Sequence, residues 1–273
     1  MTTIEAVILG LVQGVTEFLP ISSTAHLRLV PAVAGWDDPG AAFTAVLQLG
    51  TLAAVIAFFL RDLLRMLRSA LRALQRRDER PDTDARHLLY LIIGTIPIGI
   101  AGILLRHAVE GAFRSLWVVA SALIVVALLL AWVERRRHDQ PGRTLDAIDL
   151  RDAVLIGCAQ ALALVPGVSR SGITLLAAMA LGIRRDAAAR FSFLLSVPAV
   201  AAAGLFELPK ILKSHDIGGV PLAVGLIVAA LSGYASIAWL LKFLRTRSTM
   251  PFVIYRVILG LVIIAMLVSG RLG

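Results

Sequence analysis

Four stretches of this 273-residue chain hold enough consecutive uncharged residues to cross a membrane, a fifth at residues 191–206 is shorter, and a sixth at residues 251–270 is interrupted only by Arg256. A spanning helix needs about 20 such residues, because the hydrocarbon core is roughly 30 Å thick. The composition agrees, since 58% of the residues are hydrophobic, 16% are charged and the mean hydropathy is +0.85. Such a composition excludes a water-soluble domain and predicts an all-α polytopic membrane protein. The expected spans are residues 41–60, 88–105, 115–133, 191–206, 217–241 and 251–270.

The N-terminal 19 residues carry no basic leader and no small-residue cleavage site. We therefore expect them to belong to the mature fold rather than to a signal peptide. The chain is expected to form one integral membrane domain over residues 1–273. Its single cysteine, Cys158, supports neither a disulfide framework nor a metal site.

Basic residues are distributed unevenly among the expected loops. Of the 27 Lys and Arg residues, nineteen fall in the loops at 61–86, 134–151, 184–190 and 242–247, and six fall in the loops on the other side. Because cytoplasmic loops hold the excess of Lys and Arg, these four loops are predicted to be cytoplasmic and both termini to be outside. The net charge of +9 is therefore attributed to basic loops that orient the protein in the membrane, and no nucleic-acid partner is expected.

That topology requires two further apolar stretches, residues 2–36 and 152–183, to enter and leave the membrane on the same side. Pro20 and Pro166 interrupt these stretches in their middle. Proline removes a backbone donor and disfavours helix at the residue before it. The half-helix over residues 23–35 would be about 20 Å long, too short to span the membrane. Two Pro-broken re-entrant helical hairpins are therefore predicted.

A weak internal repeat relates the two hairpins. A shift of 147 residues aligns Gly10 with Gly157, Gln13 with Gln160 and Ser22 with Ser169. The repeats would cover about residues 1–135 and 150–273, each with one hairpin and three spans. An odd number of crossings inverts the second copy, so the two broken tips are expected to meet near the middle of the membrane.

Irregular backbone at membrane depth survives only in a protein interior or beside a wet cavity, so each break marks a candidate site. The motifs "PISST" and "PGVSRSGIT" place hydroxyls where the half-helices begin, and helix N-termini attract anions. Arg170 adds a guanidinium group, which can form paired hydrogen bonds with phosphate oxygens. These features predict a site for a phosphate or diphosphate headgroup. The candidate substrate-binding residues are Gln13, Ser22, Ser169, Ser171 and Thr174.

A second group of side chains is suited to catalysis. His26 lies four residues after Ser22 and three after Ser23, so a helix beginning there places hydroxyl and imidazole on one face. That arrangement permits a nucleophile with an adjacent base. Glu17, just before the break, could orient His26, shuttle a proton or hold a divalent metal. The candidate catalytic residues are Glu17, Ser23, His26 and Arg170, with Glu17 also the candidate metal ligand.

Structural roles stay open for the same residues. Ser22 and Ser169 could serve only as helix caps. Glu17 and Arg170 could form a purely structural buried pair, and His26 could be a packed core residue.

Other polar and small residues have a structural explanation from the sequence. Arg28 and Arg256 are expected to reach the lipid headgroups. Small or amide-bearing residues pack or bridge helices in membranes. This applies to Gln13, Gln48, Gln160, Gly50, Gly94, Gly99 and Gly102.

Four motifs together resemble those of the undecaprenyl-diphosphatase family of bacterial membranes, which is also known for bacitracin resistance. They are "QGVTEFLPISSTAH", "FTAVLQLGT", "PGVSRSGIT" and "PFVIYR", in matching order and spacing from residue 4 onward. The resemblance implies hydrolysis of the C55 isoprenoid diphosphate to the monophosphate carrier of cell-wall synthesis, at the outer side of the cytoplasmic membrane. It also implies re-entrant hairpins in an inverted repeat and dependence on a divalent cation, Mg²⁺ or Ca²⁺.

On the family pattern, Glu17, Ser23 and His26 match the functional positions of the first motif. Ser169, Arg170 and Thr174 match those of the second motif. Members often carry a glutamate where this chain has Gln13. Glu17 would then be the only carboxylate of its motif, and substrate phosphates and water would complete the shell of a cation.

The mechanism expected from the sequence has Ser23 or a water attack the terminal phosphorus, activated by His26 with Glu17 behind it. Arg170, Ser169 and the two helix N-termini would hold the diphosphate. A transporter or flippase of polyprenyl phosphate is the competing class, because inverted repeats with broken helices also build carriers. A scaffold for cell-wall enzymes would leave the intramembrane charges without a purpose. The sequence leaves open whether Ser23, His26 or water is the nucleophile, and chain-length preference and oligomeric state also stay open.

Overall fold

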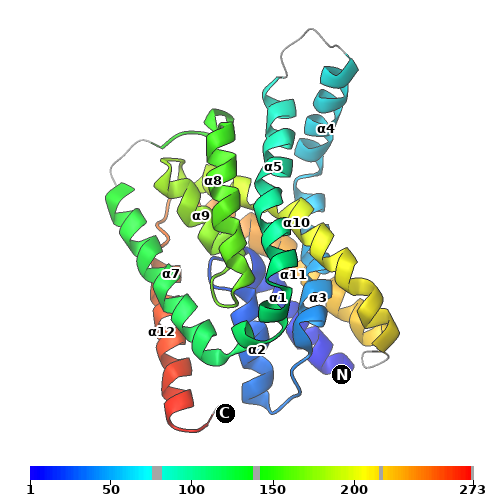
Figure 1. Cartoon of the computed structure of the whole chain (residues 1–273). Helices are drawn as coiled ribbons and strands as arrows, with labels where there is room; N and C mark the ends of the chain where they lie inside the picture. The colour runs from blue at the N-terminus through cyan, green and yellow to red at the C-terminus, as the bar shows by residue number, and fades with distance from the viewer. Residues whose placement is uncertain (76–81, 138–141, 215–217, 272–273) are drawn as a thin grey trace.

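The computed structural model describes the chain except for residues 76–81, 138–141, 215–217 and 272–273. Its described part is helical (Figure 1). The α-helices are α1 (Thr3–Phe18), α2 (Ser23–Ala34), α3 (Gly40–Phe58), α4 (Leu60–Gln75), α5 (Thr83–Leu104), α6 (Arg106–Glu110), α7 (Leu116–Arg137), α8 (Leu150–Ala161), α9 (Arg170–Ala180), α10 (Arg185–Ser214), α11 (Gly219–Leu244) and α12 (Met250–Val268). Short 3-10 turns are η1 (Ala112–Arg114), η2 (Leu145–Ala147) and η3 (Leu162–Leu164).

Six of these helices, α3, α5, α7, α10, α11 and α12, are long and apolar enough to cross a membrane. Each covers one of the six predicted spans, which confirms the all-α polytopic fold class. The expected span at residues 191–206 lies within a longer helix, since α10 runs for 30 residues and contains Pro198 and Pro209. The first residue of the expected span at 217–241, and parts of the basic loops at 76–81 and 138–141, lie outside the described residues.

The two Pro-interrupted apolar stretches form two broken helix pairs, α1 with α2 and α8 with α9. Helices α2, α8 and α9 have 12, 12 and 11 residues, or less than about 20 Å each, which is too short to span the membrane. Helix α1 packs along α11, and α8 packs along α5. The two breaks therefore lie inside the helix bundle rather than at its edge (Figure 1).

The second helix of each pair begins with an unusual serine. Ser22 and Ser169 have φ angles of 74° and 71°, and no other non-glycine residue of the described chain has a positive φ. Each side chain caps its helix, accepting from the backbone N–H of Ala25 and Gly172 at 3.4 and 3.1 Å. Such backbone angles cost about 1–3 kcal/mol and persist only where the surroundings enforce them. The chain therefore maintains a strained turn at both breaks.

Glycines allow the broken pairs to approach their neighbours. Gly10 of α1 faces the backbone of Gly225 in α11, and Gly157 of α8 faces that of Gly94 in α5. Gly50 and Gly94 are close-packing points, as predicted. The prediction was wrong for Gly99, where an added Cβ would meet nothing within 4 Å. The physical reason is that Gly99 lies on an unpacked part of α5.

The paired breaks, serine caps and glycine contacts are the features that an internal repeat leads us to expect. The division of the chain into repeats over residues 1–135 and 150–273 itself stays a prediction. Both termini lie at the same end of the bundle, and α4 extends at the opposite end (Figure 1). Helix α4 and the last turn of α7, which carries Arg135, Arg136 and Arg137, lie toward that opposite end.

Replacing Gly10 with alanine tests the contact between α1 and α11. The new Cβ would lie 3.1 Å from the Cα of Gly225 and nearer still to its carbonyl oxygen. We expect the free energy of unfolding to fall by about 1–3 kcal/mol, the usual cost of overpacking. Thermal unfolding in detergent measures this change. The matched control is Gly99→Ala, which should change stability by less than about 1 kcal/mol, so equal losses in both variants would contradict the assignment.

Candidate active site

The two breaks meet each other in the middle of the bundle. The Ser171 hydroxyl donates to the carbonyl of Leu19 at 3.0 Å, and the Gly167 N–H donates to the Thr24 hydroxyl at 3.4 Å. These contacts join segments that are more than 140 residues apart in sequence. The start of α9 is thereby fixed against the end of α1 and the start of α2.

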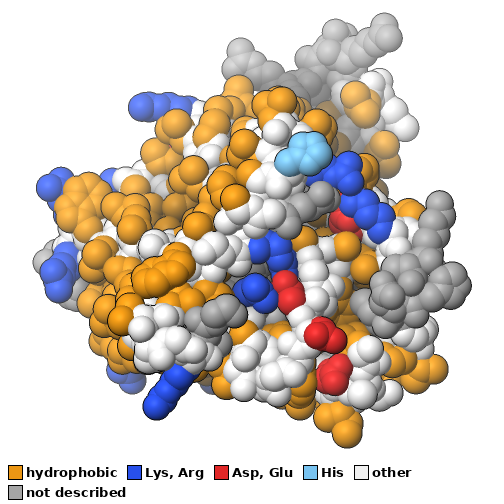
Figure 2. All heavy atoms as spheres, turned by 60° about the horizontal axis from the view of Figure 1, so that its bottom comes forward, with side chains coloured by type: hydrophobic (Ala, Val, Ile, Leu, Met, Phe, Trp, Pro, Cys, Tyr) orange, Lys and Arg blue, Asp and Glu red, His pale blue; other side chains and the backbone are white. Residues whose placement is uncertain are grey.

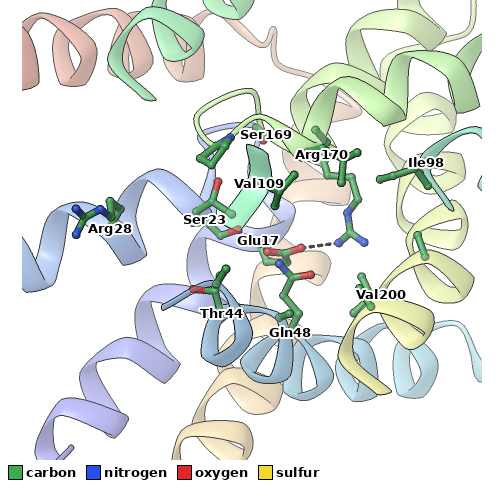
Figure 3. Close-up of a pocket in the computed structure, with 18 of the residues that line it drawn as sticks. Glu17, Ser23, Arg28, Thr44, Gln48, Ile98, Val109, Ser169, Arg170 and Val200 are labelled. Atoms are coloured by element: carbon green, nitrogen blue, oxygen red, sulfur yellow. Dashed lines mark hydrogen bonds and ion pairs between the residues drawn. The ribbon is translucent and has the colours of Figure 1, made fainter. Parts of the chain in front are cut away.

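Three polar side chains at this meeting point donate hydrogen bonds to the Glu17 carboxylate. One carboxylate oxygen accepts from the Ser23 hydroxyl at 2.5 Å and from the Gln13 amide at 2.8 Å. The other accepts from Nη2 of Arg170 at 2.5 Å (Figure 3). Glu17 is 5% exposed, so this ion pair is largely removed from solvent. Charged side chains among membrane spans are costly to bury and usually have a function. Removing either Glu17 or Arg170 would leave the other as an unpaired buried charge.

A pocket of about 210 Å³ opens beside this cluster. Glu17, Ser23, Ser169 and Arg170 line it, and Figure 3 shows the Arg170 guanidinium reaching toward the Glu17 carboxylate. These four predicted site residues are therefore brought together. Other polar residues of the wall are Thr24, Arg28, Thr44, Gln48 and Arg114.

Five other predicted site residues do not line the pocket. Gln13 is fully buried behind Glu17 and holds its carboxylate. Ser22 is the N-cap of α2, and the Ser171 hydroxyl donates its hydrogen bond to the Leu19 carbonyl. The Thr174 hydroxyl bonds the Arg170 carbonyl at 2.7 Å and the Ser192 hydroxyl at 2.5 Å, which fixes α9 against α10. These residues shape the site, and a direct contact with substrate stays a prediction for each of them.

His26 is the fifth, and it does not face the Ser23 hydroxyl. Its Nδ1 lies 2.7 Å from the Ser22 carbonyl, and its Nε2 lies 2.6 Å from the Tyr255 hydroxyl. The rings of His26 and Tyr255 also lie nearly parallel, with centroids 5.7 Å apart. The expected pairing of Ser23 with His26 is thus replaced by a pairing of Ser23 with Glu17. The sequence reasoning treated α2 in isolation and therefore missed Tyr255 of α12.

Arg256 corrects a second expectation, because it does not extend to the headgroups. Its side chain is 0% exposed and donates to carbonyls of both breaks, namely Pro20 at 3.1 Å, Gly167 at 2.9 Å and Val168 at 3.1 Å. It also donates to Leu123 at 3.1 Å and to Ala122 at 3.3 Å, both in α7. Backbone carbonyls at membrane depth must find internal partners. Arg256 supplies them at the places where proline has interrupted the helices.

Part of the pocket wall was not predicted from the sequence. Thr44 and Gln48 lie on one face of α3, four residues apart, and both line the pocket. Both residues belong to "FTAVLQLGT", one of the motifs that resemble the family, and this motif could have indicated that they line the site. Arg28, which was expected to reach the headgroups, also lines the pocket and forms an ion pair with Asp38 at 3.3 Å.

The donor set does not form a metal site held by the protein alone. Within the described residues, no three His, Cys, Asp or Glu side chains are close enough to hold an ion. Glu17 is the one carboxylate of the pocket wall, and both of its oxygens already accept hydrogen bonds. The buried Oε1 of Gln13 has no partner among the described residues, but an amide oxygen adds no charge.

Replacing Arg256 tests its role in holding the two breaks. In Arg256→Lys, the single ammonium nitrogen of lysine has three donors and cannot reach the five carbonyls that the planar guanidinium of arginine contacts. We expect a loss of about 3 kcal/mol or more in the free energy of unfolding, measured by thermal denaturation in detergent. The control is Arg271→Lys at the exposed C-terminal end, which should leave the midpoint unchanged. Equal midpoints for both variants would contradict this role.

Comparison with known proteins gives a consistent result over nearly the whole chain. The family model described as bacitracin resistance protein BacA matches residues 6–262. A protein of Myxococcus xanthus named undecaprenyl-diphosphatase is 51% identical over 274 residues, covering 100% of this chain and 92% of the relative. A protein of the same name from Chloroherpeton thalassium is 47% identical, covering 100% and 99%. This chain therefore belongs to the bacitracin resistance protein BacA family.

Proposed function

We propose that this protein hydrolyses undecaprenyl diphosphate to the monophosphate carrier and inorganic phosphate, recycling the lipid carrier of cell-wall synthesis. The names of its relatives support this activity. The single observation that carries the proposal is the Ser23 hydroxyl on the Glu17 carboxylate at 2.5 Å, with Arg170 on the other oxygen, all beside one pocket. These are a nucleophile, a base and a phosphate-binding cation in one place.

The substrate phosphate first competes with Glu17 for Arg170. A guanidinium binds a phosphate through several charge-assisted hydrogen bonds, so Arg170 can transfer from the carboxylate to the diphosphate. Glu17 then loses its neutralising partner, which makes its carboxylate a stronger base. Substrate binding would thereby activate the Glu17–Ser23 pair.

The Ser23 oxygen then attacks the terminal phosphorus while its proton passes to Glu17. The bond between that phosphorus and the bridging oxygen breaks, and the polyprenyl monophosphate leaves. Glu17 passes the proton it received to the leaving monophosphate oxygen. Water then attacks the phosphoserine and gives a proton to the freed Glu17 carboxylate. The bond between the phosphorus and the Ser23 oxygen breaks, the proton on Glu17 returns to Ser23, and inorganic phosphate is released. A direct attack by water, held by Glu17 in the same position, uses the same residues without the covalent intermediate.

His26 acts indirectly in this scheme. Its hydrogen bonds to Ser22 and Tyr255 hold the first turn of α2, which carries Ser23. The catalytic role that the sequence suggested for His26 stays a proposal, and a positioning role is the one that its contacts favour. Gln13, Ser22, Ser169, Ser171 and Thr174 likewise keep the attacking and binding groups in place.

A divalent cation enters this proposal as part of the substrate. Mg²⁺ and Ca²⁺ prefer oxygen ligands, and a diphosphate provides several of them. Glu17 is the one acidic side chain of the described pocket wall that could contribute to its shell. When bound, the cation would neutralise part of the phosphate charge.

The membrane setting completes the proposal. The excess of Lys and Arg in the loops at the end opposite to the termini supports a cytoplasmic placement of that end. The pocket wall includes Arg28 of α2 and Arg114 of η1, and α2 lies toward the end that carries the termini (Figure 1), so the site would open to the outer side of the cytoplasmic membrane. A carrier that only transports polyprenyl phosphate is not favoured, because it has no use for a serine held by a carboxylate.

Phosphate release from a long-chain polyprenyl diphosphate by the purified protein tests the activity. We expect Ser23→Ala and Glu17→Gln each to reduce kcat by at least about 100-fold, because each removes one half of the nucleophile and base pair. Ser248→Ala, a serine substitution in the loop before α12, is the matched control and should retain full activity. Full turnover by Ser23→Ala would eliminate the covalent route, and no release by the folded wild type would eliminate the proposed function.

Chelation separates a cation carried by the substrate from one held by the protein. We expect excess EDTA to suppress phosphate release and to leave the thermal midpoint of the substrate-free protein within about 1 °C. A resident ion would stabilise the folded state by binding it alone, so its removal would lower the midpoint. A clear drop in the midpoint on chelation would contradict this proposal.

A further inference from the structure

The pocket has a second basic end that the proposed reaction does not use. Arg28 of α2 and Arg114 at the end of η1 both line it. Arg28 lies five residues beyond Ser23, which corresponds to about 7.5 Å along the helix axis. Figure 3 shows Arg28 further along the same helix, on the side away from Arg170. Figure 2 looks onto the end of the molecule that carries the termini and shows charged side chains gathered amid apolar surface.

One carboxylate is shared between these two guanidinium groups. Asp38, in the loop between α2 and α3, accepts from Nη2 of Arg114 at 2.7 and 2.6 Å and lies 3.3 Å from Nη1 of Arg28. Partial burial raises the pKa of Asp38, but the hydrogen bonds from Arg114 and Gly40 and the charges of Arg114 and Arg28 outweigh it, so the pKa lies below its usual value. Asp38 is therefore ionised at neutral pH, and the trio keeps a net charge of +1.

Both arginines retain donors beyond those that contact Asp38. A guanidinium has five N–H donors, and Asp38 engages a single nitrogen of each arginine. Nε of Arg28 is buried and has no hydrogen-bond partner in the described part of the chain. An unpaired buried donor costs about 1–3 kcal/mol, so its persistence in a pocket wall points to a ligand oxygen.

We propose that Arg28 and Arg114 form a second phosphate subsite at the outer mouth of the pocket, between water and the Glu17–Ser23–Arg170 cluster. This inference rests on the proposed function for its substrate. The recognised chemistry is a phosphate group, which belongs either to the diphosphate headgroup as it arrives or to inorganic phosphate as it leaves. Asp38 weakens binding by competing for the same guanidinium groups, which keeps the phosphate exchangeable.

Inhibition by inorganic phosphate, measured with the KM and kcat for polyprenyl diphosphate, tests the subsite. We expect Arg28→Gln and Arg114→Gln each to weaken phosphate binding about tenfold, the size of one charge-assisted hydrogen bond, with little change in kcat. A raised inhibition constant identifies the departing phosphate, and a raised KM identifies the arriving headgroup. Arg271→Gln removes a positive charge outside the pocket and should change neither constant.

Asp38→Asn separates binding from a structural role. It breaks the same ion pair as Arg114→Gln, so a merely structural pair would shift both variants in the same direction. A binding role predicts opposite directions, because the asparagine releases positive charge and should lower the inhibition constant of phosphate. Shifts in the same direction, or unchanged constants in both arginine variants, would overturn the inference.

The subsite can also be distinguished from the proposed reaction. If the wild type releases no phosphate, the proposed function fails, and the subsite is tested by the rise in thermal midpoint that inorganic phosphate causes. That rise should be present in the wild type and reduced in Arg28→Gln. An active wild type, with both KM and the phosphate inhibition constant unchanged in Arg28→Gln and Arg114→Gln, would overturn the subsite alone.

Discussion

The need to satisfy backbone polar groups inside a membrane organises this protein. Proline at positions 20 and 166 interrupts two helices within the apolar bundle, and carbonyls left at such breaks have no water to bond. Arg256 resolves this by donating to Pro20, Gly167 and Val168 together, while Ser22 and Ser169 cap the helices that resume. The breaks can therefore lie in contact, and the polar site exists because they do.

The contact between the breaks allows two opposite charges to be buried next to each other. Glu17 and Arg170 belong to different broken pairs and neutralise each other, so neither is stranded in the apolar interior. The same pairing holds Glu17 against Ser23 and leaves Arg170 beside the pocket. A phosphate can replace the carboxylate on Arg170, since both are anions with oxygen acceptors. In the proposed mechanism, the ion pair that stabilises the site before substrate binds is thus the interaction that the substrate exchanges.

Much of this architecture could be predicted from local sequence. Apolar runs located the six spans, and proline in the middle of two further apolar stretches located both breaks, because these signals depend on neighbouring residues alone. The grouping of Glu17 with Arg170 required the further hypothesis of an internal repeat. Arg256 and His26 were misplaced because their partners come from distant elements, namely the two breaks and Tyr255. No periodic pattern indicates such partners, and Gly99 failed for the same reason, since exposure depends on the neighbouring helices.

A double-mutant cycle on phosphate release tests most directly whether residues of the two breaks act as one catalytic unit. The cycle compares Glu17→Gln, Arg170→Gln and the double variant, each checked for folding by thermal unfolding in detergent. If the carboxylate and the guanidinium work on the same substrate through their mutual exchange, the double variant should be little slower than the worse single variant. Losses in kcat/KM that multiply, as for independent sites, would contradict the account.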